Sequence, residues 1–303
     1  MGIKKIVIGL TLSLLLGSGA VVGANYDRGF AAYEAYDYES ALRELTPLAE
    51  LGEARAQSLL GYMYQGVLEN QKTAVKWYTL AAQQGDSFAQ SNLGVMYQKG
   101  HGVLENHKTA VKWYALAAGQ GHDIAQANLG HMYENGKGVA VNNKTAVNWY
   151  TLAAEQGQPD AQCDLGTMYD FGKGVLENDK TAVKWYTLAA EQGHARCQSN
   201  LGIMHIHGTG VAVNSKTAVK WITLAAKQGY AAAQNLLAAS YEFGKGVLTD
   251  TKRAYMWYNI STYNGHKSAG ENKLEIAKNM TSSQLNTAQD MSRRCLESNY
   301  TDC

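Results

Sequence analysis

The chain has 303 residues, and its 27 lysines and arginines nearly balance its 26 aspartates and glutamates. Without a basic excess, the sequence gives no reason to expect a nucleic-acid partner. Glycine occurs 31 times and proline only twice. The glycines recur at fixed positions, so they mark turns and close contacts and not a flexible linker.

Residues 1–24 stand apart from everything that follows. A pair of lysines precedes an apolar run at 6–16, and the small residues at 22–24 offer a signal-peptidase site. The alternative is an uncleaved anchor, because the stretch 6–22 approaches the ~20 apolar residues of a membrane span. We expect a cleaved signal peptide, a mature chain that begins near Asn25, and a periplasmic or secreted location.

Residues 25–53 are expected to form an N-terminal capping helix pair. The segment YDRGFAAYEAYDYESALRELTPLAELG at 26–52 lacks the Gly-x-Gly turn of the units that follow. The terminal units of a repeat array need a polar outer face. A divergent first pair is therefore what a repeat array predicts at this end.

Six tryptophans, spaced 36 residues apart, show that one unit is copied along the chain. The phrase ENQKTAVKWYTLAAQQG at 69–85 returns as ENHKTAVKWYALAAGQG at 105–121 and as ENDKTAVKWYTLAAEQG at 177–193. A fixed period of this length is typical of supersecondary units that stack and bury their apolar faces on one another. The tryptophans are Trp77, Trp113, Trp149, Trp185, Trp221 and Trp257.

The first half of each copy predicts an amphipathic helix. In AQSNLGVMYQKG, the residues Ala89, Leu93, Met96 and Tyr97 recur at the spacing of one helix face. A glycine follows the leucine in five copies, although glycine costs about 1 kcal/mol against alanine inside a helix. We therefore expect a ring of the partner helix to lie against the backbone there. These glycines are Gly61, Gly94, Gly130, Gly166 and Gly202.

A Gly-x-Gly connector leads from the first helix to the second. Its first glycine, such as Gly136, is expected to be a left-handed C-cap, and its second, such as Gly138, allows the chain to reverse. Seven residues before each tryptophan stands an asparagine or aspartate, whose side chain would cap the second helix and contribute ~1 kcal/mol over alanine. The predicted caps are Asn70, Asn106, Asn142, Asn178, Asn214 and Asp250.

The pattern AxxxLGxMYxxGxGVxxNxxxAxxWYxxAAxxG resembles that of the Sel-one-like repeat family, and six copies cover residues 54–266. The resemblance implies an all-α fold, a right-handed α/α superhelical solenoid of stacked, tetratricopeptide-like helix pairs. It also implies a role in assembling proteins, often in bacterial envelopes. Two departures stand out. The first copy lacks three residues of the connector, so its turn must be tighter, and the fifth has His205 where the others carry tyrosine.

Residues 267–303 are expected to form a C-terminal capping helix and a tail closed by a disulfide. Thr281 and Gln284 have the spacing of a capping box, which predicts a helix that continues to Arg294.

Four cysteines follow the expected signal peptide, and an even number in an exported protein favours two disulfides. The sequence alone leaves three pairings open. Cys163 and Cys197 fall on equivalent helices of successive copies, and Cys295 and Cys303 bracket the segment LESNYTD. We expect these two local pairs, and on the chain-entropy model the longer loop would contribute about 3–4 kcal/mol.

Two ladders of repeated residues have a structural interpretation and a functional one. The Trp–Tyr pairs would suit stacking on sugars or bases, but their identical placement in every copy favours a packed core. A lysine two residues after each cap predicts a row of charge along one edge. We interpret this row as a solvated edge, with a weak role toward anionic surfaces as the alternative. The lysines are Lys72, Lys108, Lys144, Lys180, Lys216 and Lys252.

The sequence offers little for chemistry. His205 and His207 are the only histidines close enough to suggest a metal, and two ligands do not make a site. We expect no metal and no cofactor. The chain has neither a GxSxG elbow nor an SxxK pair. Some cysteine-rich relatives of the resembled family are described as penicillin-binding or β-lactam-hydrolysing, but they carry paired cysteines within each repeat, which this chain lacks.

Helix-pair solenoids expose an extended concave face, lined by the first helix of each pair. Positions on that helix that differ between copies are free of stacking duty, so we expect a partner to touch them. The candidate partner-binding residues are His131, Glu134, Asn135, Thr167, Asp170, Phe171, Ile203, Ile206, His207, Glu242 and Phe243.

These observations predict an exported, non-enzymatic scaffold that binds a protein or an extended peptide of the bacterial cell envelope through its concave face. We expect it to be a monomer by itself, to bind no nucleic acid, and to keep no membrane span after signal cleavage. The alternative function is a penicillin-binding enzyme, or one that acts on β-lactams or peptidoglycan, of the cysteine-rich branch of the resembled family.

Overall fold

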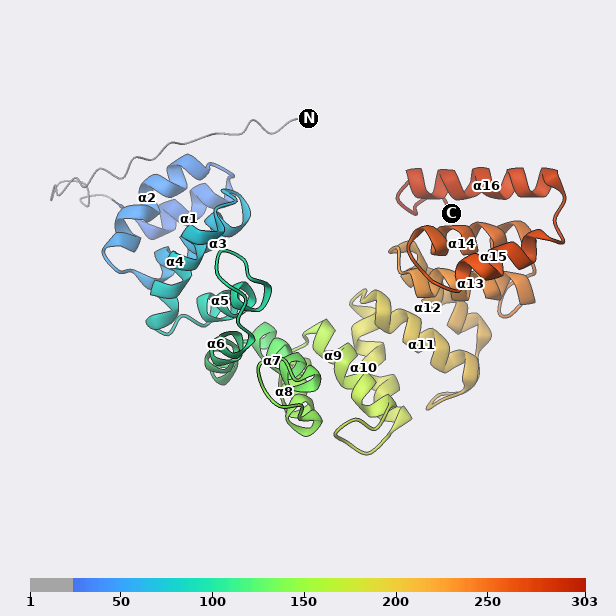
Figure 1. The fold of residues 1–303 in the computed structure, drawn as a ribbon, viewed down its shortest axis with the longest axis horizontal. Helices are drawn as coiled ribbons and strands as arrows, with labels where there is room; N and C mark the ends of the chain where they lie inside the picture. The colour runs from blue at the N-terminus through green and yellow to red at the C-terminus, as the bar shows by residue number, and fades with distance from the viewer. Residues whose placement is uncertain (1–23) are drawn as a thin grey trace. The chain divides into compact units, whose positions relative to one another are not determined.

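The computed structural model describes residues 24–303, in which every regular element is an α-helix (Figure 1). The chain divides into two compact units, with the boundary between Glu105 and Asn106. The expected signal peptide lies outside the described residues, apart from its last position. Among the helices described, none combines the length and the apolar character needed to cross a bilayer.

The first unit contains five helices within residues 24–105. They are α1 (Tyr26–Glu34), α2 (Tyr38–Glu50), α3 (Ala54–Gly66), α4 (Gln71–Gln83) and α5 (Ser87–Lys99). The helices α1 and α2 pack on each other and are joined without a Gly-x-Gly turn. The shortened connector of the first copy is only the segment 67–70, and Glu69 takes a left-handed φ of 48° to complete it.

The second unit contains eleven helices within residues 106–303. They are α6 (His107–Gly119), α7 (Asp123–Asn135), α8 (Asn143–Glu155), α9 (Pro159–Asp170), α10 (Asp179–Glu191), α11 (Ala195–His207), α12 (Ser215–Lys227), α13 (Ala231–Phe243), α14 (Thr251–Tyr263), α15 (Ala269–Ala277) and α16 (Ser282–Glu297). We call the odd-numbered helices α3 to α13 the A helices and the even-numbered helices α4 to α14 the B helices.

The C-terminal segment contains two helices where the sequence led us to expect one. Helix α16 begins with the predicted capping box, in which the Gln284 backbone N–H donates to the Thr281 hydroxyl and Gln284 accepts from the Thr281 N–H. Helix α15 was missed. It has nine residues, and Ser268 at its N-terminus makes no side-chain capping bond, so neither its length nor a cap signal distinguishes it in the sequence.

The predicted turns and caps define the helix ends. Gly136 ends α7 with a left-handed φ of 66°. The side chain of Asn142 accepts the backbone N–H of Thr145 at 3.0 Å, and so caps α8. The other five predicted caps make the same bond to the residue three places on. These local signals therefore set where each B helix begins.

In four of the five Trp–Tyr pairs, the tyrosine is more deeply buried than the tryptophan. Tyr186 is fully buried, and a Cβ added to Gly166 would lie 2.6 Å from its ring. This confirms the expected ring against the glycine, with Ile222 taking the place of the ring in the fifth copy. The prediction of a tryptophan core is correct for Trp77 and Trp257, which are buried. Trp185 and Trp221 are half-buried and pack against the core of the neighbouring copy, whereas Trp113 and Trp149 are only half-buried.

Each A helix carries a buried glutamine whose amide donates to a backbone carbonyl of the preceding helix. The Gln162 amide donates to the carbonyl of Ala154 on α8 at 3.2 Å, and its oxygen accepts from Gln192 on α10 at 2.8 Å. The oxygens of Gln57, Gln126, Gln198 and Gln234 accept an equivalent bond from the residue that follows the B helix of the same copy. We call this recurring set the glutamine ladder; it comprises Gln57, Gln90, Gln126, Gln162, Gln198 and Gln234.

The last rung of the glutamine ladder ends on the C-terminal tail. In the sixth copy, Asn264 takes the place of the B-helix glutamine and donates to Gln234 at 2.9 Å. Asn264 also exchanges hydrogen bonds with the hydroxyl of Tyr300, which lies near the disulfide between Cys295 and Cys303. The tail therefore closes the ladder at this end of the second unit.

Candidate interaction surface

The hydroxyls of the buried tyrosines donate to side chains on the last turns of the A helices. The Tyr150 O–H donates to Glu134 at 2.8 Å, and burial raises the pKa of the Tyr150 phenol, so it remains a protonated donor at neutral pH. The Tyr186 O–H lies 3.1 Å from Asp170 and 3.2 Å from the Thr167 hydroxyl. The same type of bond joins Tyr258 to Glu242.

Four predicted partner-binding residues therefore also hold a helix pair together. They are Glu134, Thr167, Asp170 and Glu242. Internal variation suggested that these positions were free of structural duty. What varies is only the acceptor, since a carboxylate, an amide oxygen or a hydroxyl oxygen can each accept the hydrogen bond from the tyrosine O–H.

The other predicted residues are spread over the C-terminal halves of four A helices, α7, α9, α11 and α13. Phe171 and Phe243 are 65% and 63% exposed, and Ile206 packs against the C-terminal core. The side-chain amide of Asn135 donates to the carbonyl of His131 on its own helix at 2.9 Å. The remaining two are His207, which is exposed, and Ile203, which is half-buried.

A polar groove of about 380 Å³ lies on α7, α9 and α11, closer to their N-termini than most of the predicted residues. Among those predicted residues, only His131 lines it. The lining residues are Ile124, Ala127, Asn128, His131, Gln158, Asp160, Asp164 and Arg196.

Sequence reasoning missed this groove, although a signal was present. The second residue of the A helix changes along the second unit from Ile124 to Asp160 to Arg196, while the residue that follows it stays small, alanine or cysteine. Four residues further on, Asp164 replaces the asparagine of other copies, such as Asn128. These two varying positions lie one to two helical turns before the positions that we predicted to bind a partner.

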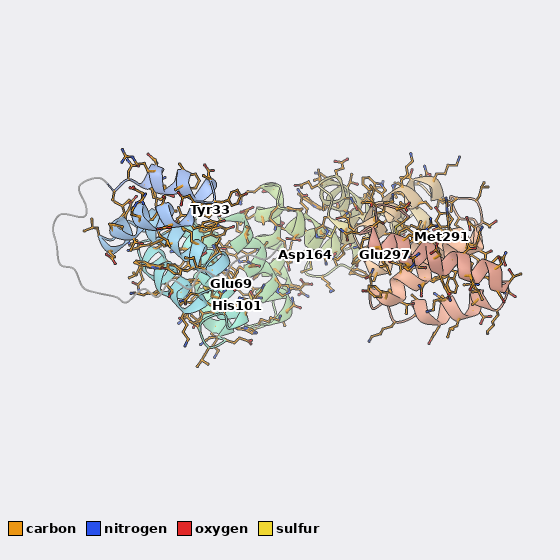
Figure 2. All side chains as sticks on the ribbon, turned by 90° about the horizontal axis from the view of Figure 1, so that it is seen from above. Tyr33, Glu69, His101, Asp164, Met291 and Glu297 are labelled. Atoms are coloured by element: carbon orange, nitrogen blue, oxygen red, sulfur yellow. A yellow bond between two sulfur atoms is a disulfide. The ribbon has the colours of Figure 1, made fainter. Side chains whose placement is uncertain are left out.

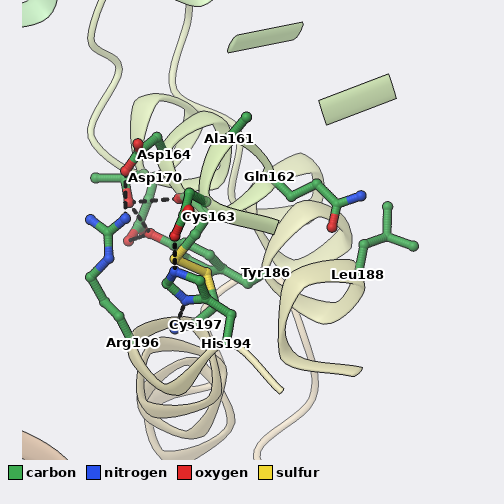
Figure 3. The surroundings of a disulfide bond; sticks show 12 residues. Ala161, Gln162, Cys163, Asp164, Asp170, Tyr186, Leu188, His194, Arg196 and Cys197 are labelled. Carbon is green, nitrogen blue, oxygen red and sulfur yellow. Dashed lines mark hydrogen bonds and ion pairs between the residues drawn. A yellow bond between two sulfur atoms is a disulfide. The ribbon is translucent and has the colours of Figure 1, made fainter. Parts of the chain in front are cut away.

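An ion pair crosses the groove (Figure 3). Arg196 on α11 lies 2.5 Å from Asp164 on α9. Burial raises the pKa of the Asp164 carboxyl, although Arg196 opposes that effect. Beside it, the His194 ring lies 3.0 Å from Asp160, and this hydrogen bond lowers the pKa of Asp160. The groove thus presents both charge signs and amide groups, which suit the backbone and polar side chains of an extended peptide.

The disulfide between Cys163 and Cys197 fixes the ion pair in place. It joins α9 to α11 with the two Cα atoms 5.7 Å apart, and Figure 3 shows it beside the charged side chains. Asp164 follows one cysteine in sequence, and Arg196 precedes the other. The covalent link therefore sets the spacing of the two backbones that carry the pair. The second predicted pairing is also present, since Cys295 is bonded to Cys303.

The described residues contain one group with the spacing of metal ligands, formed by Cys163, His194 and Cys197. Both thiols are joined in the disulfide, and the His194 ring caps α11 by accepting the backbone N–H of Cys197. His205 and His207, the histidines that the sequence singled out, belong to no such group among the described residues.

The first unit has a separate aromatic groove of about 330 Å³ on α1, α3 and α5. The Arg55 guanidinium lies 4.0 Å above the ring of Tyr26, a cation–π contact. Tyr33, labelled in Figure 2, makes an edge contact with Tyr62. Sequence reasoning treated this segment only as a cap and overlooked its density of aromatic residues. The lining is completed by Phe30, Ser58, Leu59, Asp86 and Phe88.

Comparison with known proteins identifies the repeat. The Sel1 repeat model matches six consecutive segments, at 54–86, 87–122, 123–158, 159–194, 195–230 and 231–266. A Sel1 repeat protein from Oxalobacter formigenes is 34% identical, with a TM-score of 0.73 over 78% of this chain and 96% of that chain. A protective antigen of uropathogenic Escherichia coli that displays an SLR fold is 31% identical, with a TM-score of 0.62 over 91% of this chain and 69% of that one. No curated protein matches the chain.

Proposed function

Because the chain belongs to the Sel1 repeat family, whose members are generally scaffolds for protein–protein interaction, we propose that it is an exported, non-enzymatic scaffold of the bacterial envelope. It binds a protein or an extended peptide along the A-helix face of its second unit. The observation that carries this proposal is that, within each copy, the repeated residues and the varying residues lie in different places. Repeated residues such as Tyr186 and Gln162 are buried in the stack, whereas residues that differ between copies line the groove on α7, α9 and α11.

The cysteine pattern supports export. Both disulfides join cysteines that local structure has brought together, and none of the described cysteines is free. Disulfides persist in oxidising compartments and are rare in the cytosol. N-terminal sequencing of the protein from the envelope fraction tests this point. We expect the mature chain to begin near Asn25, and a chain that retains its first residues would refute cleavage.

The binding face is tested by site-specific photocrosslinking in the cell envelope. A photoreactive residue at Ile124, which is half exposed in the groove, should capture a partner. The matched control is Leu152, which is similarly exposed but lies on helix α8. Capture from both positions alike, or from Leu152 alone, would contradict binding along the A helices.

Charge reversal separates the groove from the general surface. Asp160→Lys should weaken capture from Ile124, because Asp160 lines the groove beside the ion pair. The control Glu155→Lys makes the same change of charge at an exposed site outside it. Thermal unfolding of both variants shows whether the fold is intact. If both variants lose capture equally, general charge and not the groove controls binding.

The enzyme alternative makes a distinct prediction. An enzyme acting on β-lactams would hydrolyse a chromogenic cephalosporin, and turnover would be lost on changing a single residue. A scaffold would show no such turnover. Turnover abolished by one groove substitution would replace the scaffold proposal with the enzyme.

A further inference from the structure

The connectors between A and B helices form one continuous edge of the second unit. A Cβ added to Gly138 would lie 2.4 Å from the backbone carbonyl of His107, and one added to Gly174 would lie 2.5 Å from that of Asn143. The equivalent glycines of the next two connectors make the same close approach. Each connector therefore rests on the start of the preceding B helix. We call this surface the loop edge; it comprises residues 136–144, 172–180, 208–216 and 244–252.

Apolar side chains project from the loop edge at regular intervals. Leu176 and Leu248 are 91% and 90% exposed, and they occupy the same place two copies apart. In the alternate copies, Val141 and Val213 stand one place later and are about two-thirds exposed. Single exposed apolar residues are ordinary on protein surfaces. Here an exposed leucine or valine recurs in each of four consecutive connectors, between α7 and α14.

The loop edge is also basic. Its four segments contain seven lysines and three acidic residues, although the chain as a whole has a net charge of only +1. The four ladder lysines on it are exposed, while Lys173 lies 3.8 Å from Glu134. Asp250, one of the three acids, caps α14 and lies 3.7 Å from Arg253.

The opposite edge has the reverse charge. The turns that lead from each B helix to the next A helix are 119–123, 155–159, 191–195 and 227–231. Together they contain three acidic residues and one lysine. The second unit therefore carries positive charge along one edge and negative charge along the other. Its exposed apolar connector residues lie on the positive edge. Such an asymmetry orients a protein on a negatively charged surface.

We propose that the loop edge of the second unit docks on the surface of a bilayer that contains anionic lipids. Its lysines lie among the headgroups, and Leu176 and Leu248 enter the boundary between headgroups and acyl chains. Juxtaposed cations and apolar side chains are the combination that binds such an interface. A protein partner would need a matching pocket for each projecting leucine, whereas a fluid bilayer accommodates any spacing. Docking leaves the groove on the A helices free, so this surface is independent of the proposed scaffold site.

Vesicle co-sedimentation tests the proposal directly. The protein is the chain from residue 24 onward with its disulfides formed, so the apolar leader cannot contribute to binding. We expect it to sediment with vesicles of phosphatidylglycerol and phosphatidylcholine but not with phosphatidylcholine alone. Binding should weaken as salt is added, because salt screens charges at this range. Equal binding to both vesicles, or binding to neither, would overturn the proposal.

Paired variants locate the binding surface. Leu176→Asn with Leu248→Asn should weaken vesicle binding about tenfold or more, since burial of each leucine contributes to membrane affinity. The matched control is Leu152→Asn with Leu224→Asn, which changes two exposed leucines on the B helices α8 and α12. Thermal melts of both pairs exclude unfolding as the cause. If the control pair lost as much binding, the loop edge would not be the membrane contact.

Charge variants provide the second comparison. Lys144→Glu with Lys216→Glu should lower the affinity for anionic vesicles at least about tenfold, because each lysine near such a surface contributes roughly a factor of five. Lys227→Glu, on the acidic edge, should have a much smaller effect. Unchanged vesicle binding by the double variant overturns the proposal. A second result would also overturn it: the protein binds no vesicles, and a loop-edge variant loses a cross-link to another protein. The loop edge would then be a protein interface.

Discussion

Gly166 shows how one missing side chain sets the distance between two helices. Its Cα faces the fully buried ring of Tyr186, and a Cβ would lie 2.6 Å from that ring. The ring cannot retreat, because its hydroxyl is bonded to Asp170 and Thr167. The close contact therefore outweighs the intrinsic cost of glycine in a helix, which is about 1 kcal/mol.

Gly166→Ala should lower the free energy of unfolding by about 1–2 kcal/mol, as overpacking exceeds the gain in helix propensity. The control is Gly119→Ala at the end of α6, where an added Cβ meets nothing within 4 Å. This control should be neutral or slightly stabilising. Urea denaturation of both variants decides, and equal destabilisation would mean that the tyrosine contact is not what selects glycine.

Asp164 should make stability depend on acidity in an unusual direction. Burial raises its folded pKa above the ordinary 3.8, so its charged form is disfavoured more in the folded chain than in the unfolded chain. The charged Asp164 carboxylate therefore lowers the free energy of unfolding at pH values above its folded pKa. This destabilisation disappears as the pH falls from the folded pKa toward 3.8. Relative to Asp164→Asn, the wild type should gain unfolding free energy as pH falls through this window.

Asp160 provides the opposite sign for comparison. Its hydrogen bond to His194 lowers its folded pKa, so it contributes stability above 3.8 that is lost as pH falls through the folded pKa. Denaturation curves for Asp160→Asn and Asp164→Asn across the acidic range should diverge from the wild type in opposite directions. Parallel slopes would show that the ion pair with Arg196 outweighs burial at Asp164.

Sequence reasoning was correct for residues whose task is local and repeated. The glycine beside the ring could be predicted because five copies keep it against helix propensity. It was wrong for Trp149, because sequence periodicity places Trp149 and Tyr150 on the same helix without showing which of the two points inward. The tyrosine is fully buried and the tryptophan only half-buried, a distinction that depends on how the next copy packs.

At the scale of the helix, the N-cap separates local from tertiary stabilisation. Asn142→Ala should lower the free energy of unfolding by ~1 kcal/mol, because the Thr145 N–H loses its acceptor. Asn148→Ala, at an exposed position inside the same helix, should be neutral or stabilising. Thermal melts distinguish the two, and a loss of several kcal/mol at Asn142 would indicate a tertiary contact beyond the cap.

The helices were predictable to the extent that their ends carry signals. The B helices begin directly after the predicted caps such as Asn142, and Gly136 and its equivalents end most of the A helices. The repeat pattern alone was enough to predict both kinds of helix end. Helix α15 has no side-chain cap and lies outside the period. Its nine residues are held by packing on α14, and such tertiary support leaves no local trace in the sequence.

At the scale of the molecule, the two disulfides should differ in their effect. Replacing Cys163 and Cys197 by alanine should cost about 3–4 kcal/mol, because their loop is 34 residues long. The same change at Cys295 and Cys303, separated by 8 residues, should cost roughly 1 kcal/mol less. Chemical denaturation with thiol titration measures both. A larger loss at the shorter loop would show that the tail supports the array more than chain entropy implies.

The candidate surface was less predictable than the fold. Internal variation correctly pointed to the A helices, yet it could not distinguish a side chain open to solvent from one that bonds a buried tyrosine, as Glu134 does. The groove depends on three copies at once, since Ile124, Asp160 and Arg196 come from successive repeats. Which of the varying positions converge is decided by stacking geometry, and no single copy contains that information.

The glutamine ladder has a consequence for how such a chain can change its length. Every rung in the second unit joins a donor on a B helix to an acceptor on the A helix of the same copy, and Tyr300 meets the last donor. Gaining or losing one whole copy would recreate every rung, whereas a shorter insertion or deletion within a helix would leave a buried amide without a partner. Only the connector can shorten without this cost, as in the first copy, where Gln84 still donates to Gln57 at 2.8 Å. Evolution can therefore lengthen or shorten this array in steps of 36 residues while the two ends stay the same.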